Sequence, residues 1–328
     1  MPKITDFKTN IFSLSAGNFK NAALELFHLH ANENPVYKNY IKLLNIQVDK
    51  VRSITEIPFL PIDLFKKHII LTDDTKYHTV FESSGTTGVQ PSRHYVADIK
   101  LYEESILAGF NHFYGNPEEY VFFALLPSYL ERTHSSLVYM ANYLMKESKT
   151  DVGGFYMYNH AELAENLAKA KKGNRKIFLI GVSFALLDFA EAYHIDLQGA
   201  VIMETGGMKG RREEIIREEL HDVLIKAFNV PGIHSEYSMT ELLSQAYSSK
   251  SGLFKCPPWM QVLIREPNDP FTYCPQGQAG GINIIDLTNI YSCPFIATQD
   301  LGRLTEDGFF EVLGRFDNSE IRGCSLLY

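Results

Sequence analysis

The spacing of apolar and polar residues predicts an alternating α/β region over residues 95–228. Short apolar runs of strand length follow amphipathic stretches of helix length throughout this region. Strands are predicted at 120–127, 152–158, 176–182 and 199–207, and helices at 97–113, 134–147, 161–172, 184–193 and 211–228. Continuously apolar strands between amphipathic helices are typical of a sheet that helices cover on both faces. We therefore expect an α/β fold.

The two ends of the chain follow other patterns. Residues 19–30 and 36–46 carry apolar side chains at helical spacing, so the segment 1–70 is predicted to be mainly helical. After position 230 the pattern favours β-segments, separated by Gly, Pro and Asp turns, at 260–266, 280–287, 295–304 and 309–315. We predict a helical N-terminal segment (1–70) packed on a main domain (71–315) whose C-terminal portion is β-rich, followed by a short tail (316–328).

Composition and charge exclude several classes of function. The chain has 328 residues and a net charge of -8, and sequence-independent nucleic-acid binding needs a surplus of Lys and Arg instead. No stretch resembles a signal peptide or a membrane span. The four cysteines form no Cys-x-x-Cys pair, so we expect a reducing cytoplasm and no disulfides. Three of them (Cys256, Cys274 and Cys293) lack the paired spacing of a zinc site, and buried or loop cysteines are the favoured interpretation.

One hydroxyl-rich loop is a candidate anion site. It comprises Ser83, Ser84, Gly85, Thr86, Thr87 and Gly88. The two glycines let the backbone turn closely around a ligand, and backbone N–H groups in such a turn form a concave site suited to a polyphosphate. The loop lacks the Gly-Lys-Ser/Thr ending of a Walker loop. A polar surface loop is the alternative for this segment taken alone.

This loop resembles the phosphate loop of the adenylate-forming superfamily, which includes acyl-CoA synthetases, firefly luciferase and the adenylation domains of peptide synthetases. The family's loop continues to a Pro-Lys, whereas this chain continues to Pro91-Ser92-Arg93. Arg93 is therefore the candidate for the missing positive charge. Arg is a planar fork and Lys a point charge, so the two do not bind phosphate alike.

Two more segments match the family in the same order. The segment Glu204-Thr205-Gly206-Gly207 resembles the strand-end turn that contacts adenine. Residues 235–241 resemble the family's Tyr-Gly-x-Thr-Glu segment, with Ser238 in place of Gly. By this resemblance Tyr237 stacks on adenine, Thr240 bonds phosphate and Glu241 helps to hold Mg²⁺. Carboxylate oxygen is a ligand that Mg²⁺ prefers.

The fourth matching segment lies near the end of the chain. Asp300 corresponds to the aspartate that binds both ribose hydroxyls, and Arg315 to the arginine just before the family's hinge. In isolation, Asp300 is equally compatible with a turn residue, and Glu241 with a carboxylate at a helix start. The four segments together, in the family's order over residues 83–317, identify an adenylate-forming large domain.

The tail points to one branch of the family. The family's small C-terminal domain is expected to be absent, since only the short segment 316–328 follows Arg315. The acyl-protein synthetases (LuxE-like) of luminous bacteria are similarly short and carry an acyl-accepting Cys near the C-terminus. Residues 57–66 also resemble that branch. Cys324 is the corresponding thiol here, and Arg322 nearby favours the reactive thiolate. An inert thiol on a frayed terminus is the alternative.

A histidine is a further candidate for the acyl site. His134 follows a predicted strand where family members place a His or an aromatic residue near the acyl pocket. It is predicted to orient the incoming carboxylate, and a capping or packed histidine is the alternative. The predicted catalytic residues are Cys324, Glu241, Thr240, His134 and Arg315.

The sequence thus predicts an ATP- and Mg²⁺-dependent acyl-protein synthetase. It would convert a carboxylic acid, expected to be a fatty acid, to an acyl-adenylate and load the acyl group on Cys324. A partner such as an acyl-CoA or fatty-acid reductase would then receive it. Two alternatives stay open: a truncated acyl- or aryl-CoA ligase that uses free CoA, and a nucleotide- or acyl-adenylate-binding module that has lost catalysis.

Overall fold

The computed structural model describes residues 4–73, 75–84, 90–127, 132–206 and 215–316. The chain divides into two units. The β-rich unit comprises residues 1–79, 88–98 and 258–328, and the α/β unit comprises residues 80–87 and 99–257. No helix in the described ranges is long and apolar enough to cross a membrane.

The α/β unit is built on one mostly parallel sheet. The strand order is β5 (Gly154–Phe155), β4 (Tyr120–Leu125), β6 (Lys176–Val182), β7 (Val201–Thr205), β8 (His234–Tyr237) and β9 (Ala246–Ser248), and only β9 is antiparallel to its neighbour. Every residue of β4 is buried, which explains its continuous apolar pattern. The short strand β10 (Leu253–Phe254) follows β9 in the chain.

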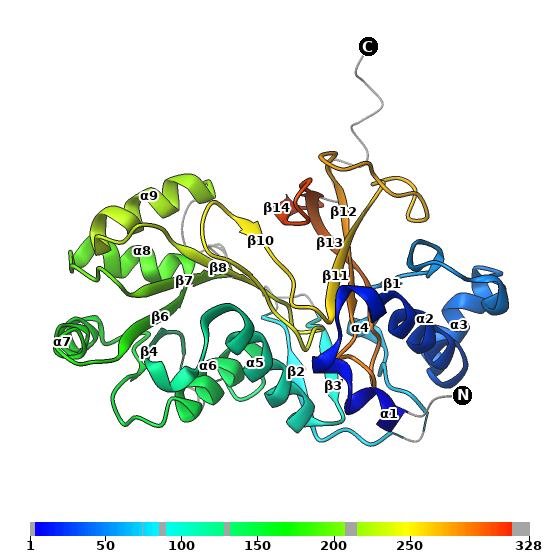
Figure 1. Ribbon diagram of the computed structural model, residues 1–328, viewed down its shortest axis with the longest axis horizontal. Helices are drawn as coiled ribbons and strands as arrows, with labels where there is room; N and C mark the ends of the chain where they lie inside the picture. The colour runs from blue at the N-terminus through cyan, green and yellow to red at the C-terminus, as the bar shows by residue number, and fades with distance from the viewer. Residues whose placement is uncertain (1–3, 74, 85–89, 128–131, 207–214, 317–328) are drawn as a thin grey trace, which may run out of the picture. The chain divides into compact units, whose positions relative to one another are not determined.

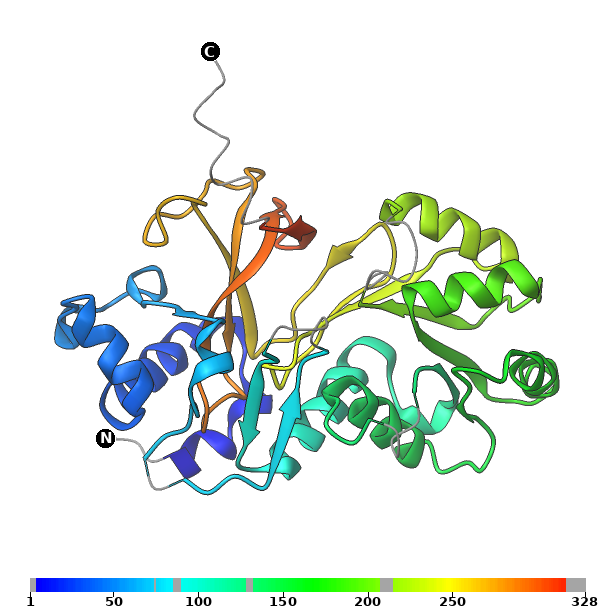
Figure 2. The same ribbon diagram turned by 180° about the vertical axis from the view of Figure 1, so that it is seen from behind.

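Helices cover both faces of this sheet. One face carries α5 (Ile99–Tyr114) and α6 (Ser136–Glu147), and the other carries α8 (Ser183–Ala192) and α9 (Arg217–Phe228), as Figures 1 and 2 show from opposite sides. The helix α7 (His160–Ala170) and the 3-10 helix η4 (Pro117–Glu119) complete the unit. The predicted sheet with helices on both faces is confirmed.

The strand predicted at 152–158 is much shorter than expected. Gly153 and Gly154 have φ of 106° and 145°, a region that side chains with a Cβ rarely adopt. A Cβ at Gly153 would lie 2.1 Å from the carbonyl oxygen of Phe122. The chain therefore bends here, and β5 keeps only two residues.

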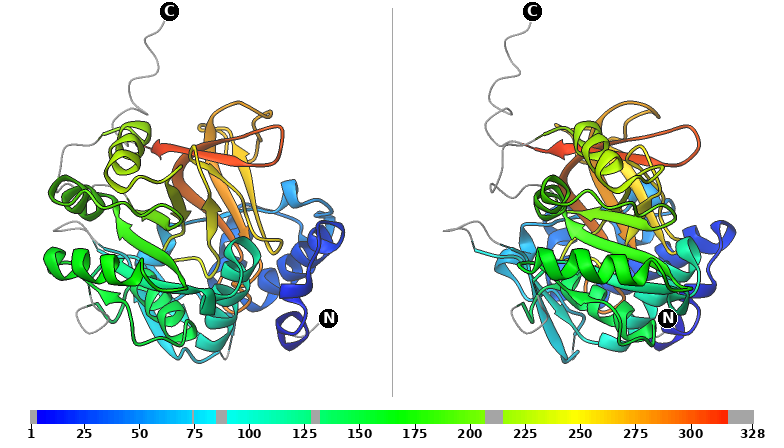
Figure 3. Two further views of the ribbon diagram at one scale, coloured as in Figure 1. Left: turned by 60° about the vertical axis from the view of Figure 1, so that its left-hand side comes forward. Right: turned by 90° about the vertical axis from the view of Figure 1, so that its left-hand side faces the viewer.

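The β-rich unit contains the four β-segments predicted near the C-terminus. They are β11 (Met260–Arg265), β12 (Gly280–Asp286), β13 (Phe295–Leu304) and β14 (Phe310–Arg315), each antiparallel to the next. The hairpin of β13 and β14 is the orange-to-red ribbon in Figure 3. The short strand β1 (Leu60–Pro61) runs parallel to β13, with Leu60 opposite Ile296.

Residues near the N-terminus belong to this β-rich unit. Its helices are α1 (Ile4–Lys8), α2 (Ala16–Glu33), α3 (Pro35–Leu43) and α4 (Leu64–Lys67), with 3-10 helices η1 (Ile11–Ser13), η2 (Val48–Lys50) and η3 (Ile54–Glu56). The ring of Tyr37 from α3 stacks at 6.0 Å on Phe295 of β13, so helices and sheet share an aromatic core. The α-helical pattern predicted over 1–70 ends at Leu43 and returns only in α4. Pro58 and Pro61 have no N–H to continue a helix.

Two short strands flank the hydroxyl-rich loop in sequence. They are β2 (Thr79–Glu82) and β3 (Arg93–Val96).

Candidate functional site

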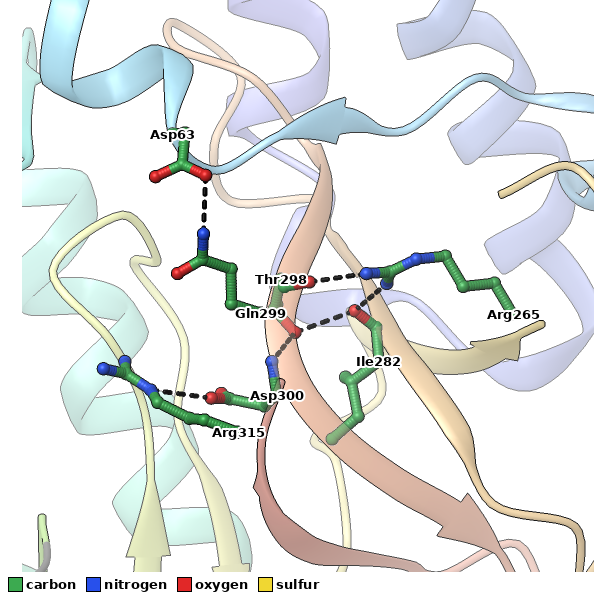
Figure 4. Close-up of polar contacts among 7 residues, drawn as sticks. All are labelled: Asp63, Arg265, Ile282, Thr298, Gln299, Asp300 and Arg315. Atoms are coloured by element: carbon green, nitrogen blue, oxygen red, sulfur yellow. Dashed lines mark hydrogen bonds and ion pairs between the residues drawn. The ribbon is translucent and has the colours of Figure 1, made fainter. Parts of the chain in front are cut away.

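The candidate ribose ligand and the candidate arginine before the hinge lie directly opposite each other in the β-rich unit. Asp300 on β13 and Arg315 on β14 are register partners. The Nε of Arg315 donates a hydrogen bond to Oδ1 of Asp300 at 3.1 Å, as Figure 4 shows. The Asp300 side chain is 11% exposed, whereas that of Arg315 is 79% exposed. The hairpin thus brings together two candidates that lie 15 residues apart in the sequence, and it holds the carboxylate with a charged donor.

The backbone around Asp300 is fixed by neighbouring side chains. The Asp300 N–H donates to Oγ1 of Thr298 at 3.1 Å, and this hydroxyl donates to the carbonyl oxygen of Ile282 at 2.8 Å. Gln299 lies between Thr298 and Asp300 in the chain, and its Nε2 donates to Oδ2 of Asp63 at 2.5 Å. Sequence reasoning missed Thr298 and Asp63. The only sequence feature that pointed to Thr298 was its position two residues before Asp300. Nothing in the sequence pattern indicated Asp63.

In the α/β unit, Glu204 lies within a group of charged and polar side chains. Ser183 Oγ donates to its Oε2 at 3.1 Å, and His221 Nε2 and Arg217 Nε lie 3.6 Å and 3.8 Å from its Oε1. Burial by itself would raise the pKa of Glu204, but His221, Ser235 and Arg217 outweigh it and the pKa is lowered. The side chain of Glu204 therefore interacts with residues of α8 and α9.

The rest of the predicted adenine turn follows β7. Gly206, whose φ is 75°, is the last described residue of the turn, and Gly207 lies outside the described residues. The Glu204 side chain is already engaged and Thr205 is 5% exposed, so contact with adenine through this turn would fall to the backbone. The role of the turn stays a prediction.

A second buried glutamate lies on the adjacent strand. Thr205 of β7 and Glu236 of β8 are register partners, and Thr205 Oγ1 donates to Oε2 of Glu236 at 2.6 Å. Burial raises the pKa of Glu236, and the nearby charge of Glu204 adds to the shift, while Ser238 and Thr205 oppose it. Sequence reasoning did not single out Glu236, although a glutamate inside an otherwise buried strand was a signal.

Replacement of Glu236 by Gln is expected to change the pH dependence of stability. The raised pKa means that the folded state binds the proton of Glu236 more tightly than the unfolded state does. The stabilisation that results is complete below the usual pKa of 4.5, and it is lost as the pH rises through the folded-state pKa. Gln resembles the neutral form at every pH. The melting temperature of the variant relative to wild type should therefore be higher at pH 8 than at pH 4. A difference that is constant with pH would contradict this.

The predicted nucleotide segment occupies the end of β8 and the following loop. Tyr237 is the last residue of β8, and its ring lies 5.8 Å from that of Phe254. Thr240 is half-buried and Glu241 is 4% exposed. No group of three or more His, Cys, Asp or Glu in the described part of the chain could hold a metal. One carboxylate together with nucleotide phosphates suffices for Mg²⁺, and the metal role of Glu241 stays a prediction.

The structure brings His134 to the strand that leads into the predicted phosphate loop. Glu82, the last residue of β2, donates its N–H to the carbonyl oxygen of His134 at 2.8 Å. Nδ1 of His134 lies 3.1 Å from the carbonyl oxygen of Val80. A carbonyl only accepts, so Nδ1 carries the proton in this contact. Ser83 is half-buried and Ser84 is exposed.

Several predicted residues lie outside the part of the chain that the structure describes. They are Gly85, Thr86, Thr87, Gly88, Gly207 and Cys324. Arg93 is described: it is the first residue of β3 and its side chain is exposed.

Comparison with solved structures identifies the fold. An open conformation of 2-hydroxyisobutyryl-CoA ligase, in complex with 2-HIB-AMP and CoA, matches with a TM-score of 0.71 at 15% identity, covering 94% of this chain and 78% of that one. The same ligase in its thioesterification state, also with 2-HIB-AMP and CoA, matches with a TM-score of 0.70 at 16% identity, covering 94% and 71%. ATP-bound MatB from Rhodopseudomonas palustris matches with a TM-score of 0.55 at 15% identity.

The MatB match covers 72% of this chain and 47% of MatB, so this chain spans about half the length of that protein. No protein-family model and no curated protein matches the sequence. The structural matches nevertheless show that the chain has the fold of adenylate-forming enzymes.

Proposed function

We propose that this protein activates a carboxylic acid with ATP. A carboxylate oxygen of the acid attacks the α-phosphorus of ATP, and the bond from this phosphorus to the oxygen that bridges the α- and β-phosphates breaks. Pyrophosphate departs, and an acyl-adenylate is formed. The observation that carries this proposal is the hydrogen-bonded pair of Asp300 and Arg315 on a chain with the adenylate-forming fold. Solved proteins of this fold contain ATP or an acyl-AMP, which supports the same chemistry here.

Each described candidate has a role in this reaction. Asp300 accepts hydrogen bonds from the ribose hydroxyls, and Arg315 keeps its carboxylate oriented. The ring of Tyr237 packs on adenine, Thr240 donates to phosphate, and His134 orients the carboxylate of the acid. A Mg²⁺ ion held by Glu241 and the phosphates would reduce the repulsion between two anions.

The acyl group then passes to a thiol. In the favoured route the Cys324 thiolate attacks the acyl carbonyl, AMP leaves with the bonding electrons, and a thioester forms. A partner protein, expected to be an acyl reductase, would take the group from Cys324. The second candidate is transfer to free CoA, and one observation favours it: the 2-hydroxyisobutyryl-CoA ligase structures contain CoA beside the acyl-AMP.

Acid-dependent exchange of labelled pyrophosphate into ATP tests the proposal. Across a panel of alkyl, aryl and hydroxy acids, at least one acid should support exchange, and the acid that does so names the substrate class. Absence of exchange with every acid and with Mg²⁺ present would favour the degenerate binding module.

A variant isolates the metal ligand. Glu241→Gln should slow exchange roughly 10²- to 10³-fold, because a neutral amide is a poor Mg²⁺ ligand and one strong electrostatic contact is lost. Its melting temperature should stay close to wild type, since the side chains have the same shape. The exposed control Glu219→Gln should exchange normally. Normal activity and normal Mg²⁺ dependence in Glu241→Gln would remove this residue from the metal site.

A further inference from the structure

Asp300 lies in a β-bulge of the β-rich unit. The register of β12 and β13 pairs Gly281 with Leu301 and then Asn283 with Ala297. A single position of β12, Ile282, therefore faces the β13 segment Thr298, Gln299 and Asp300. A bulge interrupts the ladder of hydrogen bonds and redirects the side chains in it. The direction of the Asp300 carboxylate thus depends on whatever holds the bulge in shape.

Arg265 stabilises this bulge from β11, the strand on the other side of β12 from β13. It is the last residue of β11, and its Nη1 donates to the carbonyl oxygen of Ile282 at 2.8 Å and to Oδ1 of Asn283 at 2.7 Å. Its Nη2 donates to the carbonyl oxygen of Thr298 at 2.6 Å. One guanidinium therefore connects β11 to both β12 and β13, and it binds backbone groups on both sides of the bulge (Figure 4).

The fold makes room for this side chain. Gly281 is the register partner of Arg265, and a Cβ on Gly281 would lie 2.5 Å from Cζ of Arg265. Any larger residue at 281 would exclude the guanidinium from its path across β12. The ring of Phe316 lies over the guanidinium at 5.6 Å.

The hydrogen-bond partners of Arg265 indicate that it fixes the shape of the backbone around the bulge. Burial lowers the pKa of Arg265, and no carboxylate in the described chain forms an ion pair with it, so the cost of burying its charge is not offset by a salt bridge. Its hydrogen bonds go to carbonyl and amide oxygens. Tyr273, Tyr40 and, after them, Asp300 oppose the effect of burial on the pKa of Arg265.

We propose that Arg265 is a positioning residue for Asp300 and that it acts through Thr298. Arg265 fixes the carbonyls of Ile282 and Thr298, the Thr298 hydroxyl links the same Ile282 carbonyl to the Asp300 N–H, and Asp300 then presents its carboxylate to the ribose. The inference rests on the proposed function, which assigns the ribose to Asp300.

The test compares ATP with 2′,3′-dideoxy-ATP, which lacks both ribose hydroxyls. In the full-length protein, calorimetry gives the dissociation constant of each nucleotide. Thr298→Val removes both hydroxyl hydrogen bonds, and Arg265→Met keeps the length of the side chain but removes its donors. In each variant, ATP affinity should fall about 3- to 10-fold, the effect of one misplaced hydrogen bond, while affinity for dideoxy-ATP changes less than about 2-fold.

Two controls separate positioning from general destabilisation. Thr298→Ser keeps the hydroxyl and should retain the wild-type preference for ATP. Arg303→Met removes an exposed ion pair with Glu311 on the same hairpin and should leave the preference unchanged. Thr298→Val keeps the test decisive if Arg265→Met does not fold.

The outcomes are distinct. Equal loss of both nucleotides, or no loss of either, in Thr298→Val would overturn the positioning role. If wild-type protein binds ATP no more tightly than dideoxy-ATP, the ribose assignment of Asp300 in the proposed function fails as well.

Discussion

Replacement of Asp300 by Ala is expected to weaken binding of ATP and AMP by roughly 10²- to 10⁴-fold, because the proposed role gives its carboxylate a charge-assisted hydrogen bond to each ribose hydroxyl. Each such bond is worth about 1.5–3 kcal/mol. The side chain is 11% exposed, so water compensates poorly for their loss. Isothermal titration of the folded variant with each nucleotide measures the effect.

Stability and location need to be controlled in this experiment. Arg315 loses its partner in Asp300→Ala, but its side chain is 79% exposed and water can solvate it. The melting temperature of the variant shows whether the fold is kept. Asp307→Ala removes an exposed carboxylate from the turn of the same hairpin and should bind nucleotide normally. Unchanged affinity in a folded Asp300→Ala protein would remove Asp300 from the nucleotide site.

Replacement of Cys324 by Ser is expected to abolish thioester formation on the protein. Wild-type protein with ATP, Mg²⁺ and a suitable acid should gain one acyl mass, which neutral hydroxylamine should remove because it cleaves thioesters. Cys324→Ser should still support pyrophosphate exchange, since the proposed nucleotide groups lie elsewhere in the chain. Intact-protein mass spectrometry with peptide mapping decides the outcome.

The other cysteines provide matched controls. Cys293 is fully buried, and burial raises its pKa to about 12, so little thiolate exists near neutral pH. Cys256 and Cys274 are half-buried, and burial also raises the pKa of Cys274. Single Ser variants of these two should load the acyl group normally. Label on any of the three, or rapid transfer to free CoA without labelled protein, would favour the CoA-ligase alternative.

Much of the fold followed from local pattern. Strands β4 and β6 were predictable because residues buried on both faces of a sheet form unbroken apolar runs. The four C-terminal strands were predictable from turn residues at their ends. The pattern failed at 152–158, where Gly153 and Gly154 adopt positive φ and β5 keeps only two residues.

The sequence by itself determined which residues of the site have recognisable chemistry. Asp300, Arg315, Tyr237 and Glu241 stand in short segments that resemble a known family, and such segments are visible without coordinates. The short strand β1 could not be anticipated, because its partner β13 lies near the opposite end of the chain.

Only the tertiary structure decided how the groups act on one another. Arg265 reaches the bulge of Asp300 because β11, β12 and β13 are neighbours and Gly281 leaves space between them. The pKa values of Glu204 and Glu236 shift in opposite directions. His221, Ser235 and Arg217 outweigh the burial of Glu204, whereas burial of Glu236 and the nearby charge of Glu204 outweigh the hydrogen bonds from Ser238 and Thr205. Register, burial and electrostatic interaction depend on distances between strands that are far apart in the chain, and no local pattern contains those distances.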